Sequence, residues 1–412
     1  MSETKYFVPV GPIHPAFKEP FKFTFGIEGE KIVDVDLQMG ENHRGIEWMA
    51  MKKRNPIQVI YLAERICGIC SASHPFAFTR AVEDAMNLEV PLRAQYIRVI
   101  IAELERIHSH VLWAGVGAHE IGFDTLLHLT WLLREKVMDI LEMLTGNRVN
   151  YGIWQIGGVR RDITKEKITS VKRVLDEYKE KFNKVYDLFL RDKTIAMRTV
   201  DVGVMTYRQA LELCAVGPTT RASGVPKDIR VDMPYEGYVD LEIEPVLPTM
   251  VRDETHGDVY DRVIVRVLEI AQSIDIIEQT FDILLDTPEG DILAEKNIAK
   301  LLNVMLKKAD GEGVGRHEAP RGEVYHYVRL EEGKTEIETW KARAPTFNNV
   351  YTWVPQMLGN EIADIPIITA AIDPCIACMD RVTVVDETKN SQILTKEDMH
   401  RMSIEKTRRL RI

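Results

Sequence analysis

Two Cys-x-x-Cys pairs stand near opposite ends of this chain, and they limit how it can fold. The first pair is Cys67 and Cys70, and the second is Cys375 and Cys378. Roughly 300 residues separate the two pairs, whereas a structural zinc module usually closes over about 15–20 residues. The four thiols can therefore meet only after the whole fold has closed. A thiolate cage assembled in this way suits a soft transition metal held in a finished core.

Length and composition favour a single domain with a large core. The chain has 412 residues, of which 45% are hydrophobic. It has no Gly/Ser-rich, Pro-rich or single-charge run that would mark a linker, and no internal repeat. We therefore expect residues 1–381 to form one domain and residues 382–412 to form a charged C-terminal extension.

Charge and cysteine usage exclude several other classes of protein. The formal net charge of −10 at pH 7 argues against nucleic acid as a partner. No apolar stretch reaches the ~20 residues of a membrane helix, so membrane association would have to come through partner subunits. The five cysteines are mostly in metal-type spacing and suit a reducing cytosol.

The apolar pattern changes from strand-like to helical along the chain. Phe21, Phe23 and Phe25 alternate with polar residues, and a second strand is expected after the turn at residues 28–30. Apolar residues recur every three or four positions further on, which predicts amphipathic helices over residues 97–111, 133–144, 168–189 and 263–281.

A hairpin is expected over residues 323–328 and 335–341, across the turn that contains Gly333. The predicted class is α+β and mostly helical, with a central helix bundle and small peripheral β-sheets in the N-terminal and C-terminal parts. A bundle holds metal sites well because rigid neighbouring helices fix the positions of the ligands.

Longer strings surround the two cysteine pairs. The first reads Arg-x-Cys-Gly-x-Cys-x-x-x-His from Arg65 to His74, and the second reads Asp-Pro-Cys-x-x-Cys-x-x-Arg from Asp373 to Arg381. Four shorter strings occur in order along the same chain. They are Gly-Pro-Ile-His-Pro at 11–15, His-Arg-Gly-Ile-Glu at 43–47, Gly-Gly-Val-Arg-Arg-Asp at 157–162 and Glu-Ala-Pro-Arg-Gly at 318–322.

Together the six strings resemble the large, catalytic subunit of nickel–iron hydrogenases. The second cysteine string ends in an arginine, which is typical of the energy-converting, membrane-associated group of the formate hydrogenlyase and ferredoxin-linked type. The chain therefore resembles that group in particular. That group is related to the quinone-site large subunit of respiratory complex I. The resemblance implies an oxidoreductase that catalyses 2H⁺ + 2e⁻ ⇌ H₂.

The resemblance implies a nickel–iron centre, with diatomic CO and CN ligands on the iron, held by the four cysteines. Cys70 and Cys378 would bridge the two metals, and Cys67 and Cys375 would bind nickel only. Thiolates suit soft metals and lose their protons to the metal. The alternatives are a structural zinc site and a degenerate or empty site kept for packing.

Three residues have expected catalytic roles by the same resemblance. His74 follows Cys70 by four residues, so its imidazole N–H could reach the bridging sulfur, although a core histidine is the ordinary alternative. Arg321 would supply a fixed positive charge over the open coordination position. The alternative for Arg321 is a salt bridge to a nearby acid such as Glu318 or Glu323.

Glu19, which precedes Pro20 in the first proline-containing loop, is the expected proton carrier. Heterolytic hydrogen chemistry needs a base close to the metal, and partial burial raises the pKa of a carboxyl group into a useful range. The resemblance implies that the matching glutamate of energy-converting relatives is the first proton carrier. An exposed loop glutamate without a catalytic role is the alternative.

Further residues have supporting roles in the expected site. Pro320 would pack near the diatomic ligands of the iron. Glu47, Glu64 and Asp373 are candidates for a proton path or for contacts to the metal ligands, and Asp373 could instead cap the turn that presents Cys375.

Three other residues are expected to have structural roles only. Cys214 has no partner in the sequence, and we expect it to be buried. His108 and His110 are two positions apart on a helix and so lie on different faces, which is typical of polar packing.

The resemblance also implies partners. Because no cysteines remain for an iron–sulfur cluster, electrons must come from a small subunit that carries a proximal cluster. Complex I-like hydrophilic and membrane subunits would hold the chain at the cytoplasmic face of the cell membrane. In maturing relatives an endopeptidase removes the C-terminal extension after the arginine of the second string, which corresponds here to Arg381.

Two other functions stay open. One is the large subunit of a complex I-like or sulfur-reducing membrane oxidoreductase without an assembled nickel–iron centre. The other is a non-catalytic subunit that transmits redox-driven motion to an ion pump. The presence of all four cysteines, His74 and Arg321 argues against the non-catalytic subunit.

Overall fold

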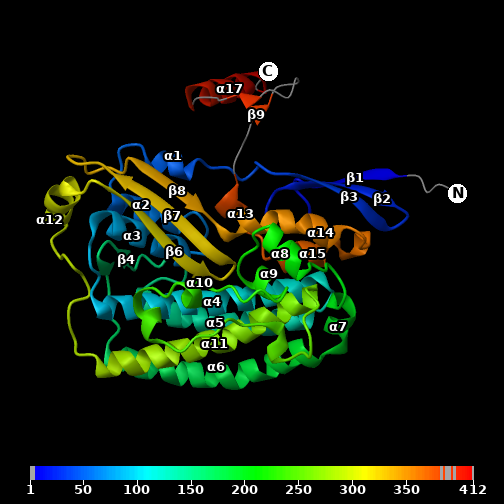
Figure 1. Cartoon of the computed structure of the whole chain (residues 1–412), viewed down its shortest axis with the longest axis horizontal. Coiled ribbons are helices and arrows are strands. Elements are labelled where there is room, and N and C mark those ends of the chain that lie inside the picture. Colours follow the sequence, from blue (N-terminus) through cyan, green and yellow to red (C-terminus); the bar gives the residue numbers. More distant parts are fainter. Residues whose placement is uncertain (1–4, 381–383, 386–390, 393–395, 411–412) are drawn as a thin grey trace.

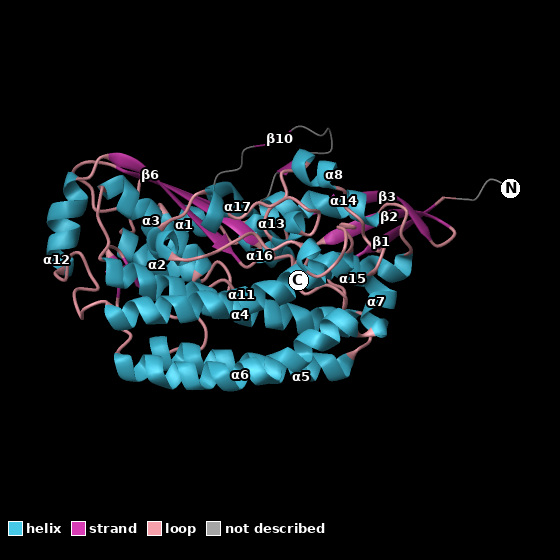
Figure 2. Cartoon of the chain, turned by 60° about the horizontal axis from the view of Figure 1, so that its bottom comes forward, coloured by secondary structure: helices cyan, strands magenta, loops and turns pink. Residues whose placement is uncertain are grey.

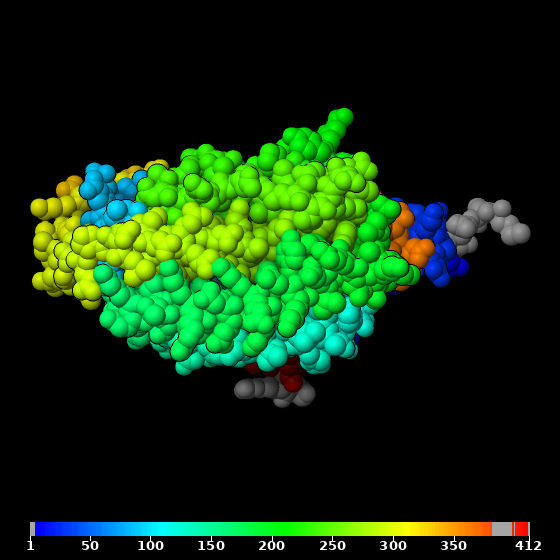
Figure 3. Space-filling model, turned by 90° about the horizontal axis from the view of Figure 1, so that it is seen from below, coloured from blue at the N-terminus to red at the C-terminus, as the bar shows by residue number. Residues whose placement is uncertain are grey.

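Four long helices form the central bundle of the chain. The computed structural model describes residues 5–380, 384–385, 391–392 and 396–410. Helix α4 contacts both α5 and α11, and α6 contacts both α5 and α11, so the four helices close around a shared core (Figures 1 and 2). Their bounds are α4 Leu92–Glu120, α5 Asp124–Thr145, α6 Lys165–Arg191 and α11 Val259–Asp286. Seen from below in Figure 3, the segment from α5 to α11 covers this face of the molecule.

The apolar stripes explain why these segments are helical. Helix α6 begins after Thr164, whose side chain accepts a hydrogen bond from the backbone of Lys167, and ends at Arg191. It buries one stripe of residues spaced by three or four positions: Ile168, Val171, Leu175, Tyr178, Phe182, Val185 and Phe189. Helix α5 ends before Gly146, which caps it in a left-handed conformation (φ +90°). All four predicted helices are present, and each extends beyond its predicted stripe.

Two three-stranded antiparallel sheets flank the bundle. The N-terminal sheet has the order β1-β2-β3, and the C-terminal sheet has the order β6-β7-β8. Strands β2, β3 and β7 match predicted strands. Strand β8 overlaps its predicted strand only at residues 339–341, and β1 and β6 were not predicted. The strands are β1 Tyr6–Val10, β2 Lys22–Glu28, β3 Lys31–Gln38, β6 Gly311–Ala319, β7 Gly322–Leu330 and β8 Thr339–Arg343.

Strand β6 escaped prediction because glycines take the place of apolar residues on one of its faces. A Cβ atom at Gly313 would lie 2.0 Å from the carbonyl oxygen of Ala81, and one at Gly315 would lie 1.8 Å from that of Ala77. Both alanines belong to α3 (Ser73–Met86), which therefore lies directly on the sheet. Only glycine permits so close an approach of a helix backbone to a strand.

Shorter elements connect the bundle to the sheets. Besides α3, the helices before the bundle are α1 Ile46–Ala50 and α2 Pro56–Glu64. The small strands β4 Trp154–Gln155 and β5 Gly158–Val159 pair with each other. Between α6 and α11 lie α7 Lys193–Thr199, α8 Tyr207–Glu212, α9 Pro218–Arg221 and α10 Ile229–Asp232. After α11 come α12 Ile298–Lys300, α13 Pro345–Asn349, α14 Trp353–Met357, α15 Ile365–Ala371 and α16 Ile376–Met379. The predicted class, mostly helical with small peripheral sheets, is confirmed.

One large hydrophobic cluster extends from Phe17 to Met379 and includes all four paired cysteines. Cys214 is exposed, so the expectation that it is buried was wrong: it follows the short helix α8 in a left-handed turn (φ +51°) at the surface. Among the described residues, no helix has the length and apolar character that crossing a bilayer requires.

The described part of the C-terminal extension comprises β9 Val384–Val385, β10 Ser391–Gln392 and α17 Lys396–Arg409. Helix α17 is set apart from the rest of the chain in Figure 1, and the side chains of residues 400–410 are exposed. The predicted cleavage point at Arg381 lies outside the described residues.

Candidate metal centre

The structure brings the four paired cysteines together. Their Sγ atoms all lie within 4.8 Å of one another, and the residues are 4–9% exposed. Cys67 and Cys70 lie in the loop between α2 and α3, Cys375 is the residue before α16, and Cys378 lies within α16. Two segments from opposite ends of the chain thus meet in the core.

The thiols of this cluster differ in the direction of their pKa shifts. Hydrogen bonds with Cys375, Cys378 and Cys70 hold the pKa of Cys67 well below its ordinary value. Burial and hydrogen bonds with the other thiols raise the pKa of Cys378 well above that value. Four converging buried thiols are a donor set suited to a soft transition metal, which replaces the thiol protons when it binds. The cysteines present therefore fit a nickel–iron centre.

Glu105 on α4 fixes the first cysteine loop. Its carboxylate accepts hydrogen bonds from the backbone N–H groups of Ala72 and Ser73 and from the Ser73 hydroxyl, at the start of α3. Burial raises the pKa of Glu105 to about 7. Sequence reasoning missed this residue, because an acidic residue within a helical stripe gives no sign of what it contacts.

Arg44 joins the two cysteine segments. Its guanidinium donates to the backbone oxygens of Arg65 (3.1 Å) and Ile66 (2.5 Å) beside the first pair, and to that of Ala377 (2.8 Å) between the second pair. The backbone N–H of Asn42 also donates to the Asp380 carboxylate at 2.7 Å. The His-Arg-Gly-Ile-Glu string therefore holds the C-terminal cysteines against the N-terminal ones, a role that was not predicted for it.

Arg321 lies in the two-residue turn between β6 and β7, with Ala319 paired to Gly322. A Cβ atom at Gly322 (φ +119°) would lie 2.6 Å from the backbone nitrogen of Gly217, so a glycine is needed for this turn to fit. Pro320, the other turn residue, is buried. The turn carries the Arg321 side chain into the cysteine cluster.

The guanidinium of Arg321 contacts several parts of the site. It lies 3.3 Å from the Cys70 sulfur and 3.3 Å from the Ser109 hydroxyl of α4. It also donates to the carbonyl and the carboxylate of Asp373, both at 2.8 Å. Burial opposes the charge, but Asp373 and the cysteine thiols hold the pKa of Arg321 well above its ordinary value.

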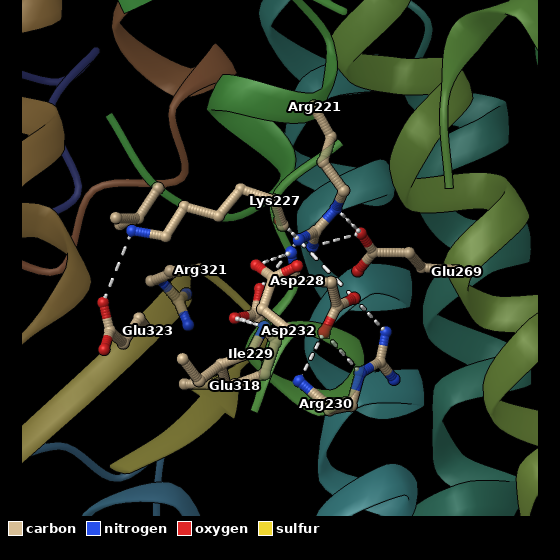
Figure 4. A network of polar contacts seen from close by, with 12 residues as sticks. Arg221, Lys227, Asp228, Ile229, Arg230, Asp232, Glu269, Glu318, Arg321 and Glu323 are labelled. Atoms are coloured by element: carbon tan, nitrogen blue, oxygen red, sulfur yellow. Dashed lines mark hydrogen bonds and ion pairs between the residues drawn. The ribbon is translucent and has the colours of Figure 1, made fainter. Parts of the chain in front are cut away.

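Arg321 does form a salt bridge with a nearby acid, as the alternative expected, but its partner is Asp373 and neither Glu318 nor Glu323. Glu318 accepts from Arg221 at 2.9 Å, and Arg221 also pairs with Glu269 of α11 at 2.6 Å (Figure 4). This buried network anchors the end of β6 to the bundle and so positions the turn that carries Arg321.

Glu19 faces the second cysteine pair from the N-terminal loop. Its carboxylate accepts from the backbone N–H groups of Ile376 (2.5 Å) and Ala377 (3.0 Å) and from the Asn42 side chain at 3.3 Å. Burial raises the pKa of Glu19, although the two backbone hydrogen bonds lower it in part. Glu19 is half-buried, which differs from the alternative of an exposed loop glutamate.

A cavity of about 360 Å³ connects Glu19 with the metal site. Cys67, Arg321 and Cys375 line one part of it, and apolar side chains from α4 line another, with Leu112 and Val116 among them. The cavity would therefore admit small apolar molecules to the same space that Glu19 and the cysteines share.

Two other predicted residues, His74 and Glu47, line separate cavities beside the cysteines. His74 lines a separate small cavity with Cys70, Cys375 and Cys378. Glu47 accepts from the backbone of Ala342 at 2.8 Å and lines a third cavity that also includes Cys378.

Glu64, His108 and His110 make buried contacts. Glu64 accepts from the backbone of Gly152 at 2.8 Å, and burial raises its pKa. His108 lies 3.1 Å from the Tyr151 hydroxyl, and His110 lies 2.8 Å from the Glu269 carboxylate. Ser109, between the two histidines, reaches Arg321 and was missed, because its neighbours carry the more conspicuous side chains.

The fold and the cysteine site define the class of protein. Residues 120–381 match the family described as respiratory-chain NADH dehydrogenase, 49 kDa subunit, and residues 44–114 match the family described as nickel-dependent hydrogenase. The chain belongs to this family of hydrogenase and complex I large subunits, and the resemblance inferred from the six strings is confirmed.

Individual relatives cover nearly the whole chain. It is 48% identical to the membrane-bound hydrogenase subunit alpha of Pyrococcus furiosus, over 100% of this chain and 96% of that protein. It is 35% identical to formate hydrogenlyase subunit 5 of Escherichia coli, over 97% of this chain and 67% of that protein.

A solved chain of an archaeal membrane-bound sulfane sulfur reductase has the same fold. Its TM-score is 0.83 at 30% identity, covering 92% of this chain and 100% of that chain. Relatives of this chain are thus subunits of membrane-bound oxidoreductase complexes.

Proposed function

We propose that this chain is the catalytic subunit of a membrane-associated nickel–iron hydrogenase that reduces protons to H₂ reversibly and is coupled to ion translocation. The observation that carries the proposal is the convergence of four buried cysteine sulfurs within 4.8 Å beside Arg321. Cys67 and Cys375 would hold nickel, and Cys70 and Cys378 would hold nickel and iron together. When bound, the nickel–iron centre supplies the two-electron chemistry of H₂.

The surrounding residues would divide the other tasks. Glu19 would take a proton from the shared cavity and return it, because its carboxylate is half-buried with a raised pKa. Arg321, held by Asp373, would keep a positive charge next to Cys70. His74 would donate a hydrogen bond to a bridging sulfur. Pro320 would exclude water from the same part of the site. Glu47, in a cavity that also includes Cys378, would serve a proton path.

Partners and location follow from the same proposal. Complex I-like subunits would hold the chain at the cytoplasmic face of the membrane, and a small subunit with a proximal iron–sulfur cluster would deliver electrons. Residues 1–381 would form the working domain, with no nucleic-acid partner.

The likeness to the sulfane sulfur reductase supports a second candidate. In that case the chain would be the large subunit of a sulfur-reducing or complex I-like oxidoreductase without an assembled nickel–iron centre. The two candidates differ in what the cysteine cluster holds.

Elemental analysis of the purified complex distinguishes the two candidates. We expect nickel in an amount equal to that of this chain, because the four thiols form a complete soft-metal site. A Cys378→Ser variant should lose the nickel, while a Cys214→Ser variant should keep it, because Cys214 is an exposed cysteine outside the cluster. A wild-type complex that carries this chain but no nickel would favour the second candidate.

The C-terminal extension should be absent from the active enzyme. The resemblance to maturing relatives carries this expectation, because in the structure the segment with Cys375 and Cys378 already meets the first cysteine pair while the extension is present. We expect a maturation endopeptidase to cut after Arg381, so that residues 382–412 are lost. Intact-mass measurement of the hydrogen-evolving complex tests this expectation, and a full-length subunit with nickel and full activity would show that closure needs no cleavage.

A further inference from the structure

A chain of three buried side chains leads from the C-terminal sheet to His74. The Trp340 indole N–H of β8 donates to Nδ1 of His326 on β7 at 3.1 Å. Nε2 of His326 lies 3.1 Å from Nδ1 of His74 on α3. All three residues are at most 1% exposed, so water does not compete for these hydrogen bonds.

The glycines of β6 make this contact possible. Because Gly313 and Gly315 have no side chains, α3 lies directly on the sheet and its His74 reaches the neighbouring strand. The rings of His326 and Trp340 also contact each other, with centroids 5.5 Å apart, and Phe78 of α3 packs edge-on against Trp340. Packing on both sides therefore sets the geometry of the hydrogen-bonded series from Trp340 to His74.

The direction of the hydrogen bonds follows from the first donor. An indole N–H can only donate, so Nδ1 of His326 is an acceptor. Burial holds the pKa of His326 well below its ordinary value, so the ring is neutral and carries its one proton on Nε2. That proton is then donated to Nδ1 of His74, since the reverse direction would leave His326 without any ring proton.

The consequence for a neutral His74 is a defined tautomer. With Nδ1 occupied as an acceptor, the ring carries its proton on Nε2. His74 lines the small cavity that contains Cys70, Cys375 and Cys378, so this N–H is the group that the ring can offer to the cysteine sulfurs.

We propose that Trp340 and His326 are positioning residues that fix His74 as an Nε2–H donor toward the cysteine cluster. The inference rests on the proposed function, because the donor matters only where thiolates hold a metal. Groups that orient a metal-site histidine in this way commonly contribute roughly 10–100-fold to metal affinity or activity.

The test uses Trp340→Phe in the complete complex, because phenylalanine keeps the ring packing and removes the N–H. We expect hydrogen turnover to fall roughly 10–100-fold with nickel content unchanged, and the infrared bands of the iron's diatomic ligands to shift. Trp154→Phe is the matched control. Trp154 is also buried and stacks on Phe76 of α3, but its indole N–H has no partner among the described residues.

A second pair of variants tests the direction of the hydrogen bonds. His326→Gln can still accept from Trp340 and donate to His74, whereas His326→Leu can do neither. We expect the glutamine variant to retain more activity and infrared bands closer to those of wild type than the leucine variant.

Failure of the inference and failure of the proposed function look different. A nickel-containing wild type whose Trp340→Phe variant has unchanged bands and rate would overturn the inference alone. Equal effects of Trp340→Phe and Trp154→Phe would also overturn it, because only packing would then matter. A wild-type complex without nickel would overturn the proposed function and this inference with it.

Discussion

Replacing Glu19 with glutamine is expected to lower hydrogen turnover by about 10²–10⁴-fold, the usual contribution of a positioned proton-transfer group. Glutamine has nearly the same shape but cannot carry the proton. The Glu19 carboxylate is suited to the task because burial raises its pKa and because it shares a cavity with Cys67 and Cys375. H₂ evolution and H/D exchange by the purified complex measure the effect.

The same substitution also perturbs a structural contact, and the experiment must separate the two effects. Both oxygens of Glu19 accept from the backbone at the start of α16, and a glutamine amide can replace only one of them. Nickel content close to wild type would show that the cysteine segment is still in place. Glu120→Gln is the matched control, since Glu120 lines the same cavity but pairs with Lys18 at 2.7 Å. Near wild-type turnover of Glu19→Gln would remove Glu19 from the mechanism.

Replacing Arg321 with methionine should damage both stability and activity. The substitution leaves the Asp373 carboxylate without its cationic partner in a buried site, which typically costs about 3–5 kcal/mol. It also removes the positive charge next to Cys70, so we expect hydrogen evolution to be lost. The unfolding temperature of the complex and its rate of H₂ evolution report the two effects.

Two further variants serve as comparisons: one keeps the charge at position 321, and the other removes an arginine elsewhere. Arg321→Lys keeps the charge but cannot contact Asp373, Cys70 and Ser109 at once, so it should be more stable than the methionine variant yet still slow. Arg343→Met removes an arginine paired with Glu323 at 3.0 Å, whose side chain is 35% exposed. Its loss should cost less than the loss of Arg321, because Glu323 keeps Lys227 (3.6 Å) and Arg316 (3.8 Å) as cationic partners. An Arg321→Met complex as stable and active as the Arg343→Met complex would contradict the prediction.

Sequence reasoning found the parts of the fold that bury one regular face. The stripe of α6 and the alternation of Phe21, Phe23 and Phe25 are local patterns, and each predicted its element. Strand β6 was missed because the glycines at 313 and 315 are placed there for contact with α3, which lies more than 200 residues earlier in the chain. Because these glycines match a helix far away in the sequence, β6 lacks the alternation of apolar and polar residues that predicts a strand.

In the candidate metal site, too, the sequence and the tertiary structure determined different features. The sequence by itself determined which thiols belong together, because Cys67, Cys70, Cys375 and Cys378 stand in two matched motifs within a recognisable family. Only the tertiary structure decided that Arg321 pairs with Asp373, that Arg44 joins the two cysteine segments and that Trp340 reaches His74 through His326. Hydrogen bonds between buried groups depend on distances of a few tenths of an ångström and on direction, and these are set by the closed core.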